Sequence, residues 1–259
     1  MRIGLIISYD GTGYCGWQRQ ENGISVQEKI EDALRELTGE DITLTAAGRT
    51  DAGVHALAQT AHFDTESGIP AEKFSYAINT ALPDDIRIKE SFRARDDFHA
   101  RYDVTRKTYV YNIWNDSHAS AILRNYSFHV PRDLDLDSME EAAEALKGEH
   151  DYTAFCAAGA QTKNFVRTVY DIDINTRGKL ISFEYTGNGF LYNMVRILTG
   201  TLVYVGLGKL APSDMGRIIE SKDRTRAGVT VPPEGLFLKD VYYSYSPRYS
   251  GMQTSLGEF

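Results

Sequence analysis

The amino-acid sequence predicts an α+β fold in which two halves share one continuous, mainly antiparallel β-sheet. Strand and helix patterns alternate along the chain, and they do so twice, over two stretches of similar length. The 259 residues, of which 42% are hydrophobic, are enough to fill a large core. We therefore predict an N-terminal half at residues 1–100, a C-terminal half at residues 101–246 and a flexible tail at residues 247–259.

A buried strand and a capped helix open the N-terminal half. The strand, from Arg2 to Tyr9, is apolar and rich in β-branched residues. Ser25 and Glu28 match a capping box, and Gly39 matches a helix C-cap. Between these caps, apolar residues recur at helical spacing at Val26, Ile30, Leu34 and Leu37. The other elements expected in this half are strands at 42–46, 56–64 and 86–93 and a helix from Pro70 to the residue before Pro83.

The C-terminal half repeats this alternation. Aromatic and β-branched residues predict a strand from Arg101 to Trp114. The other elements expected here are a helix at 138–147 capped by Gly148, a hairpin of strands at 166–175 and 179–185, a helix at 192–205 and a strand at 236–243. Each half then has the content of a ferredoxin-like or RRM-like unit.

The net charge of −8, taken alone, argues against a nucleic-acid partner, because phosphate binding needs clustered Lys and Arg. The charges are unevenly distributed, however. Acidic residues concentrate on expected helix faces, at 28–36 and 133–144. A basic stretch comprises Arg93, Arg95, His99, Arg101, Arg106 and Lys107. This stretch is either an RNA-binding stripe or a solvated strand edge.

The two cysteines and the first residues bear on the compartment. Cys15 and Cys156 lie far apart, which fits neither a disulfide framework nor a four-ligand zinc site. The N-terminal residues lack the long apolar region of a signal peptide, and no apolar stretch is long enough to cross a bilayer. We expect a cytoplasmic protein that does not enter a membrane.

The segment AGRTDAGVH, residues 47–55, carries the densest signal for chemistry. Two glycines flank Arg49 and Asp51 at a strand-to-strand connection, so the backbone can approach a ligand closely while it presents the carboxylate. The alternative is an ordinary turn in which Asp51 caps its own backbone.

Arg196 supplies a second signal, because it stands within an apolar helix. The inward face of that helix consists of Leu191, Val195, Leu198 and Leu202. Arg196 would then be half-buried, and a buried guanidinium requires a carboxylate or several carbonyl partners. Asp51 is the candidate partner, and the pairing would keep Asp51 ionised at neutral pH. Alternatively, Arg196 extends to solvent.

AGRTDAGVHA resembles the signature of the TruA family of tRNA pseudouridine synthases. The resemblance runs nearly end to end and in the family's order, with similar segments at DGTGYCGWQRQ, SVQEKIEDAL, FHARYDVTRKTYVYNIWN, FLYNMVRILTGTLVYVG and GLFLKDVYY. It implies the pseudouridine synthase fold and isomerisation of uridine at positions 38, 39 and 40, in the anticodon arm of tRNA. It also implies a homodimer, and the rearrangement needs no cofactor and no metal.

The resemblance further implies roles for single residues. Asp51 matches the essential catalytic aspartate, and Arg49 matches an arginine that contacts RNA near the target. Tyr109 matches the tyrosine that packs against the target uracil. Arg196 matches the basic partner of the aspartate, and Leu236 matches the apolar floor of the pocket.

Arg101 and Arg106 are the expected contacts to the tRNA outside the pocket. A two-fold dimer would place two such basic stretches around a shared groove, so that one subunit could hold the body of the tRNA while the other accepts the target base. Thr108 departs from the family pattern, because an arginine can occur at that position.

Two alternative functions stay open. GTGYCG, residues 11–16, matches the G-x-G-x-x-G pattern of dinucleotide-binding oxidoreductases, although residues 17–23 separate it from the next helix. A non-catalytic RNA-binding module would fit two α+β halves with sheet aromatics, but it would leave Asp51 and Arg196 unexplained. The six histidines show no metal-ligand spacing, and we interpret His55 and His62 as structural.

Overall fold

The N-terminal half is a four-stranded antiparallel unit with two helices. The computed structural model describes residues 1–21 and 23–248. The elements of this half are β1 (Arg2–Tyr9), α1 (Val26–Thr38), β2 (Thr45–Ala46), β3 (His55–Asp64), a 3₁₀ turn (Ala71–Lys73), α2 (Phe74–Asn79) and β4 (Ile86–Arg93). The strands lie in the order β4-β1-β3-β2, and the βαββαβ sequence of elements is that of a ferredoxin-like unit.

The C-terminal half repeats this arrangement with insertions. Its strands are β5 (Val104–Asn115), β6 (Phe128–Val130), β7 (Gly148–Asp151), β8 (Val166–Arg177), β9 (Leu180–Gly187) and β10 (Leu236–Tyr243). Its helices are α3 (Leu136–Ala145), α4 (Met194–Gly206) and α5 (Asp214–Ser221), with 3₁₀ turns at Thr153–Phe155, Arg224–Arg226 and Pro233–Gly235. The order β10-β5-β9-β8 corresponds strand for strand to β4-β1-β3-β2.

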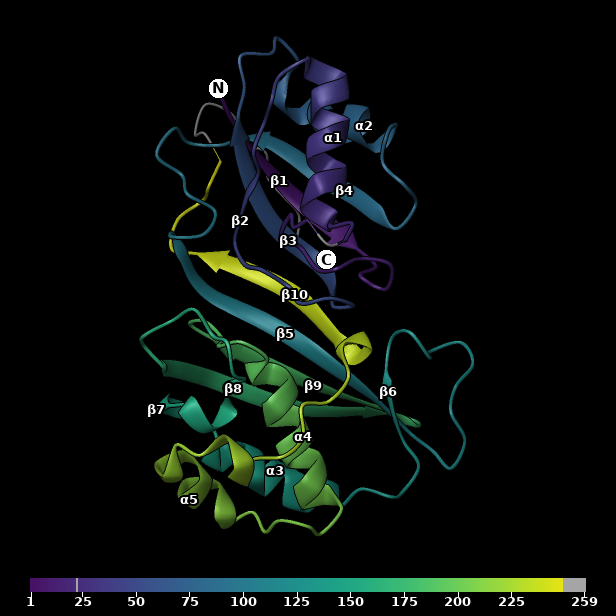
Figure 1. Ribbon diagram of the computed structural model, residues 1–259, viewed down its shortest axis with the longest axis vertical. Coiled ribbons are helices and arrows are strands. Elements are labelled where there is room, and N and C mark those ends of the chain that lie inside the picture. The colour runs from purple at the N-terminus through teal and green to yellow at the C-terminus, as the bar shows by residue number, and fades with distance from the viewer. Residues whose placement is uncertain (22, 249–259) are drawn as a thin grey trace.

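The two halves join through β3 and β10, which makes the sheet continuous (Figure 1). Phe237 and Leu238 of β10 pair in parallel with His55 and Ala56 at the start of β3. Strand β2 pairs with the same edge of β3, nearer its other end. Apart from this contact and the short β5–β6 pair, the strand pairs are antiparallel. The predicted fold class is therefore confirmed. The loop from β2 to β3 lies at the junction of the halves.

One hydrophobic core extends under both halves. It includes buried residues from β1, β3, β5, β9 and every α-helix. In Figure 1, α1 and α4 lie in front of the strands of their respective halves. The division into two domains with a boundary at residue 100 stays a prediction.

The capped helix α1 forms as predicted. The Ser25 side chain accepts the Glu28 N–H, the Glu28 carboxylate accepts the Ser25 N–H, and Gly39 takes a left-handed φ of 74°. The strand predicted at 42–46 is shorter, because α1 side chains bind the backbone of Leu44. Its N–H donates to Glu31 Oε1 and its carbonyl accepts from Gln27 Nε2.

The helix predicted at 138–147 begins and ends earlier. Asp135 is its N-cap, because the Asp135 carboxylate accepts the N–H of Ser138. Gly148 is not its cap but the first residue of β7. The helix predicted from Pro70 starts with a 3₁₀ turn and ends at Asn79, whose side-chain amide binds the backbone of Ile88.

The C-terminal tail predicted at 247–259 is described only at its first two residues. The Pro247 carbonyl accepts the Arg95 N–H, and the Arg248 guanidinium lies 4.7 Å from the ring centroid of Phe92. The rest of that prediction lies outside the described residues. No helix within residues 1–21 and 23–248 has the length and apolar character needed to cross a bilayer.

Candidate active site

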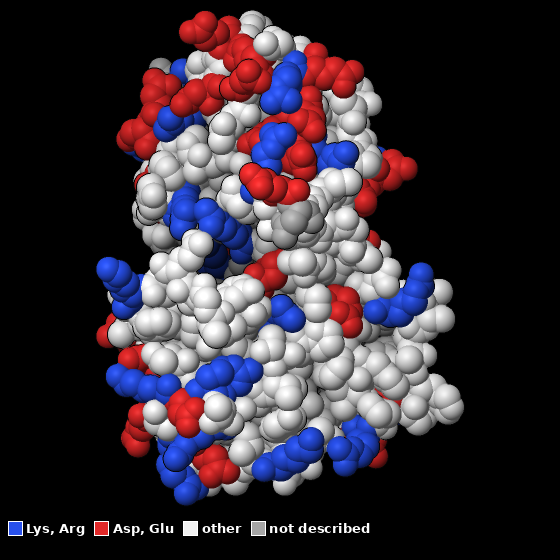
Figure 2. Space-filling model, in the orientation of Figure 1, with Lys and Arg blue, Asp and Glu red and all other residues white. Residues whose placement is uncertain are grey.

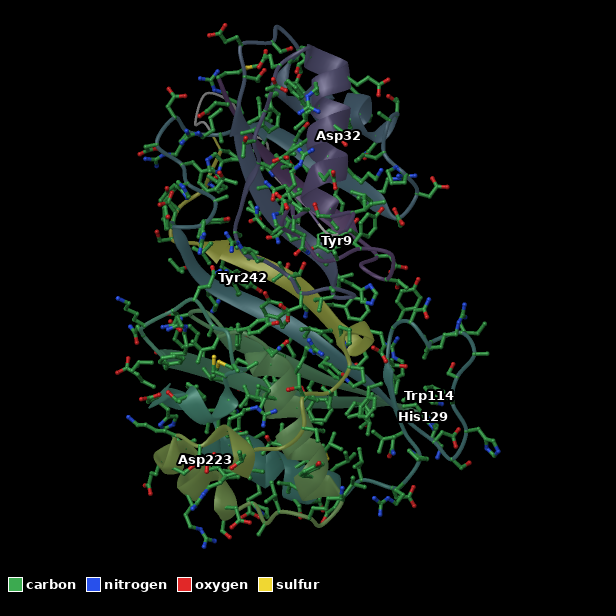
Figure 3. All side chains as sticks on the ribbon, in the orientation of Figure 1. Tyr9, Asp32, Trp114, His129, Asp223 and Tyr242 are labelled. Atoms are coloured by element: carbon green, nitrogen blue, oxygen red, sulfur yellow. The ribbon has the colours of Figure 1, made fainter. Side chains whose placement is uncertain are left out.

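The loop of residues 47–54 is fixed by hydrogen bonds to both neighbouring strands and to the segment after β1. The Ala47 N–H donates to the Thr60 carbonyl over 2.8 Å. The Thr50 carbonyl accepts the Trp17 N–H, and the Thr50 hydroxyl lies 2.7 Å from the hydroxyl of Tyr9, the last residue of β1 (Figure 3). These contacts hold Asp51 in one place instead of leaving it on a mobile turn.

Gly11 and Gly16 pack closely against this loop. A Cβ atom on Gly11 would lie 2.0 Å from the Val54 carbonyl oxygen, and one on Gly16 would lie 2.6 Å from that of Thr50. Gly16 also has a φ of 107°. Because β1 has antiparallel neighbours on both sides, the parallel sheet of a dinucleotide-binding fold is absent from the region that the structure describes around it.

Arg196 and Asp51 form the predicted ion pair. Arg196 Nη1 lies 3.6 Å from Asp51 Oδ2, and the side chains are 15% and 31% exposed. Arg196 also donates to the Val231 carbonyl from Nε, over 2.8 Å, and to Asn193 Oδ1 from Nη1, over 2.7 Å. The alternative that Arg196 extends to solvent is therefore wrong. Two neutral acceptors orient the guanidinium toward the carboxylate.

The pKa of the Asp51 carboxyl is raised above its ordinary value. Burial raises it, and the charge of Arg196 opposes this increase without cancelling it. Desolvation therefore has a larger effect on this pKa than pairing with Arg196, and the ionisation of Asp51 at neutral pH stays a prediction. Arg196 instead limits how far the pKa of Asp51 rises.

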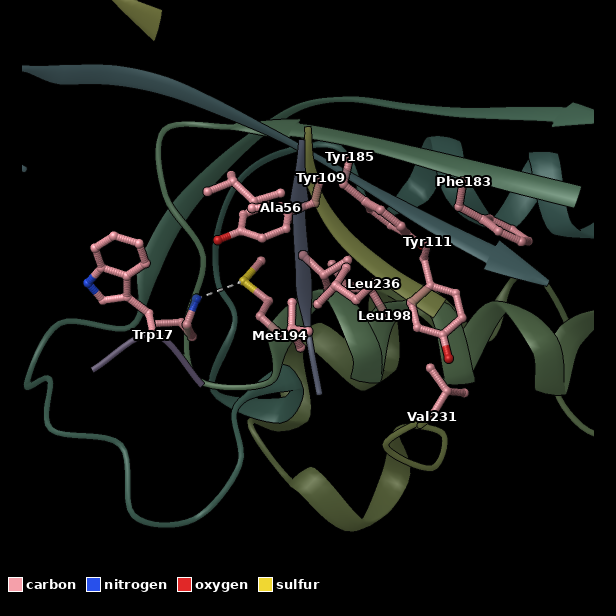
Figure 4. Close-up of a cluster of buried hydrophobic side chains, with 14 of the residues drawn as sticks. Trp17, Ala56, Tyr109, Tyr111, Phe183, Tyr185, Met194, Leu198, Val231 and Leu236 are labelled. Carbon is pink, nitrogen blue, oxygen red and sulfur yellow. Dashed lines mark hydrogen bonds between the residues drawn. The ribbon is translucent and has the colours of Figure 1, made fainter. Parts of the chain in front are cut away.

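Tyr109 and Leu236 come together beside this pair. Figure 4 shows Tyr109 of β5 and Leu236 of β10 close to Met194 of α4. Tyr109 is 9% exposed, and its ring stands edge-on to that of Phe190 with 5.3 Å between centroids. Burial, with smaller effects from Tyr9 and Asp51, raises the pKa of the Tyr109 hydroxyl, which is therefore neutral.

A cleft with a volume of about 1550 Å³ opens above these residues, between the two halves. Four cationic side chains line it, and they are Arg49, Arg101, Lys107 and Arg167. Asp51 is the single acidic residue among the described residues that line it. Figure 2 shows Lys and Arg within the hollow on this face, while acidic residues gather over the part that carries α1.

The arginines and the lysine of the predicted basic stretch have three different surroundings: an ion pair, the cleft, and the surface outside the cleft. Arg93 and Arg95 form ion pairs with the carboxylates of Asp96 and Asp97 over 3.0 and 2.8 Å. Arg101 and Lys107 line the cleft.

Arg106 lies outside the cleft, with its guanidinium 4.3 Å from the ring centroid of Tyr242. Thr108 is buried and bonds to the hydroxyl of Thr186, so this position does not face the cleft. A contact between Arg106 and RNA requires RNA that continues beyond the cleft.

Lys107 is a site residue to which the sequence assigned no individual role. Its ammonium donates to the Ala47 carbonyl over 2.7 Å, which ties β5 to the Asp51 loop. Burial, with smaller effects from Arg101 and Arg167, lowers the pKa of Lys107 to about 8. Spacing along β5 places Lys107 on the same face as Tyr109, which was an available signal. No such spacing pointed to Arg167, because the predicted hairpin on which it lies contains no other residue assigned to the site.

Lys107 should make RNA binding depend on pH. Its positive charge is present below about pH 8 and is lost as the pH rises further. At constant ionic strength, we expect the affinity for tRNA to fall on the order of tenfold from pH 7 to pH 9. Lys107→Arg, which stays charged, should remove most of this dependence when binding is measured by fluorescence anisotropy. An equal pH dependence in both proteins would contradict this role.

His55 and His62 are structural, as predicted. His55 is buried, stacks on Phe237 and accepts the Gly11 N–H on Nδ1. Burial lowers the pKa of His62 to about 4, and its Nδ1 accepts the Ala100 N–H. Within the described part of the chain, no three His, Cys, Asp or Glu residues are grouped so that they could hold a metal ion.

The charge pattern of the cleft defines the class of this protein. Clustered cations suit a polyanion, and one carboxylate with a raised pKa among them is a group suited to chemistry on that polyanion. Together with two ferredoxin-like halves, this pattern fits an enzyme that modifies nucleic acid.

Comparison with known proteins narrows this class. The family model described as tRNA pseudouridine synthase matches residues 5–103 and 142–244. The chain belongs to the tRNA pseudouridine synthase family, as the resemblance of GRTDAGVH implied.

Individual relatives agree with this assignment. The tRNA pseudouridine synthase A of Ruminiclostridium cellulolyticum is 53% identical over 93% of this chain and 99% of its own length. That of Acetivibrio thermocellus is 52% identical over the same shares. A solved structure described as a Cbf5-Nop10-Gar1 complex aligns over 92% of this chain and 48% of its own, at 12% identity and a TM-score of 0.42, a likeness too low to bear on the fold.

Proposed function

We propose that this protein isomerises uridine to pseudouridine in the anticodon arm of tRNA, at positions 38, 39 and 40, with Asp51 as the catalytic carboxylate. One observation carries the proposal. Asp51 is the lone acid among the described residues of a cleft lined by four cations, and Arg196 is its partner. Membership of the tRNA pseudouridine synthase family supports the substrate.

The reaction requires few groups. The N-glycosidic bond from N1 to C1′ breaks, the uracil turns and a bond forms from C5 to C1′. C5 loses its proton and N1 gains one, so there is no net oxidation, hydrolysis or group transfer. The ionised carboxylate of Asp51 can attack the base or the ribose, or remove a ribose proton. Leu236 and the ring of Tyr109 would hold the uracil, which must leave the base stack before it can react.

The remaining cations would hold the RNA. Arg49 is exposed and lies two residues before Asp51 in the same loop, so its guanidinium can bind phosphate next to the target nucleotide. Arg101 would bind RNA within the cleft, and Arg106 would bind RNA that extends past it. We expect the protein to act on tRNA in the cytoplasm.

A carbodiimide-based assay for pseudouridine tests the function directly. Purified protein should isomerise unmodified tRNA transcripts at positions 38–40 without added nucleotide or reductant, and it should do so after exhaustive EDTA treatment. RNA binding without isomerisation would favour a non-catalytic RNA-binding module. Activity that zinc or magnesium restores, with the folding of the tRNA controlled, would contradict a mechanism based on one carboxylate.

Variants of Tyr109 separate its ring from its hydroxyl. Tyr109→Phe should weaken turnover while retaining stacking, because only the hydroxyl is lost. Tyr109→Leu should lower kcat/KM further, on the order of tenfold below Tyr109→Phe, because the aromatic face that packs on the uracil is absent. Both constants come from initial rates over a range of tRNA concentrations. Equal activities of the two variants would rule out a stacking role.

We infer that the working unit is a homodimer. A chain with a net charge of −8 offers one cationic cleft, whereas a folded tRNA is long and must be held away from its target base as well. Two subunits related by a two-fold axis would supply both contacts. Light scattering should give a mass twice the 29.0 kDa of one chain. A stable, fully active monomer of 29.0 kDa at working concentration would contradict the dimer.

A further inference from the structure

Tyr102 is a large aromatic side chain that the fold leaves exposed. It is 76% exposed, whereas Tyr109 in the same chain segment is 9% exposed. Tyr102 nevertheless lines the cleft that contains Asp51. An exposed ring at the wall of a cationic cleft is the kind of surface on which an unpaired base stacks.

One face of the Tyr102 ring is already occupied by His99. The two ring centroids lie 4.2 Å apart with 27° between the ring planes. His99 in turn contacts the ring of His62, which is buried, over 5.1 Å. Three rings therefore lead from the interior to the cleft, and the outermost of them is still mostly exposed to a ligand.

The backbone around His99 holds this arrangement in place. His99 Nδ1 accepts the N–H groups of Arg101 and Tyr102, each over 3.2 Å. The His99 N–H donates to Asp103 Oδ2 over 2.7 Å, and the hydroxyl of Tyr245 donates to the same oxygen. A ring that is fixed before the ligand arrives loses little conformational entropy on binding.

A cation stands next to the stacking surface. The Arg101 guanidinium lies 6.0 Å from the centroid of the Tyr102 ring. A nucleotide whose base stacks on Tyr102 can therefore place its phosphate near Arg101. The pairing of an aromatic face with an arginine is typical of sites that bind single-stranded RNA.

This surface is too far from the target base to serve it. Tyr102 lies in the turn before β5, and Tyr109 is five residues along that strand from its first residue, Val104, a span on the order of 16 Å at about 3.3 Å per residue. The cleft, at about 1550 Å³, is also larger than the roughly 300–1,000 Å³ of a small-molecule pocket. There is room for a second nucleotide away from the one that reacts.

We propose that Tyr102, supported by His99 and flanked by Arg101, is a stacking platform for an unpaired RNA base other than the target uridine. The proposal rests on the proposed function, because it takes RNA as the occupant of the cleft. The platform would hold the RNA strand in register with Asp51 and would take no part in the chemistry.

Substitutions of Tyr102 test this role. Tyr102→Ala should raise KM for tRNA about tenfold and leave kcat within about twofold of wild type, because only binding is lost. Tyr102→Phe retains the ring and should behave as wild type. Tyr76→Ala is a matched control, since Tyr76 is 71% exposed and has the Lys73 ammonium 5.5 Å from its ring but lies on α2, outside the cleft. It should change neither constant.

A series of RNA substrates, each with one abasic nucleotide near the target, identifies the base. One abasic position should raise KM about tenfold for wild type and cause no further increase in Tyr102→Ala. KM within twofold of wild type for Tyr102→Ala, or abasic effects that persist in full in that variant, would overturn the platform. If the wild-type protein isomerises no substrate, the proposed function fails instead, which is a distinguishable result.

Discussion

Replacing Asp51 with asparagine should abolish isomerisation while the protein still folds and binds tRNA. The amide has the shape of the carboxylate, so the loop held by Thr50 and Ala47 should keep its conformation. It lacks the negative charge and the nucleophilic oxygen, so every role open to Asp51 is lost. We expect kcat to fall by at least about 1000-fold in the carbodiimide assay, with the Kd for tRNA changed by less than about threefold.

Asp240 provides a matched control for Asp51. Burial raises the pKa of the Asp240 carboxyl and the neighbouring Lys239 opposes the increase, which is the same balance that Asp51 has with Arg196. Asp240 lies on β10 outside the cleft, so Asp240→Asn should retain full activity. Activity of Asp51→Asn within tenfold of wild type would remove Asp51 from its catalytic role.

Replacing Arg196 with methionine should produce the second-largest loss, and the loss should depend on pH. Arg196 opposes the rise in the pKa of Asp51, so its removal raises that pKa further. Less of the carboxyl is then ionised at a given pH, and the acid limb of the kcat/KM profile moves to higher pH. We expect activity to fall on the order of 100-fold at pH 7 and to recover in part as the pH rises.

Loss of stability must be separated from this electrostatic effect. Methionine at position 196 also leaves the Val231 carbonyl without its donor, a loss of about 1–3 kcal/mol. Arg224 makes similar bonds, to the Gly228 carbonyl and the Thr230 hydroxyl, away from the cleft. Arg224→Met should therefore lower the melting temperature without moving the acid limb. An unshifted acid limb in Arg196→Met would show that Arg196 does not control the ionisation of Asp51.

Most of the fold could be predicted because its elements depend on neighbouring residues. The capping box of Ser25 and Glu28, the turn at Gly39 and the alternation along β1 all act within a few residues of the chain. Failures occurred where a distant contact decided the outcome. The strand at 42–46 is short because Glu31 and Gln27 of α1 take the backbone groups of Leu44.

Three short elements were not predicted from the sequence. The helix α5 and the strands β6 and β7 were not expected, since they are only eight, three and four residues long. Each is stabilised by its neighbours in the folded chain, β6 by pairing with β5, β7 by pairing with β8, and α5 by burying Met215, Ile218 and Ile219 in the core. Short segments gain too little from local propensity to be recognised alone.

For the site, the sequence by itself determined which side chains are present and which family the protein belongs to. It identified Asp51 between two glycines, Arg196 in an apolar helix, and Tyr109 and Leu236 on strands. It could suggest that Asp51 and Arg196 meet, since a half-buried guanidinium needs a partner. Hydrophobic patterning and turn chemistry are local, so they can be read along the chain.

Only the tertiary structure decided how these groups behave. It brought Lys107 and Arg167 to the same cleft as Arg49, and it buried Asp51 enough that its pKa rises although Arg196 lies 3.6 Å away. Desolvation and Coulomb interactions depend on distance through space and on exclusion of water by residues far apart in the chain. Neither quantity can be derived from the order of residues, which is why the identity of the carboxylate was predictable and the direction of its pKa shift was not.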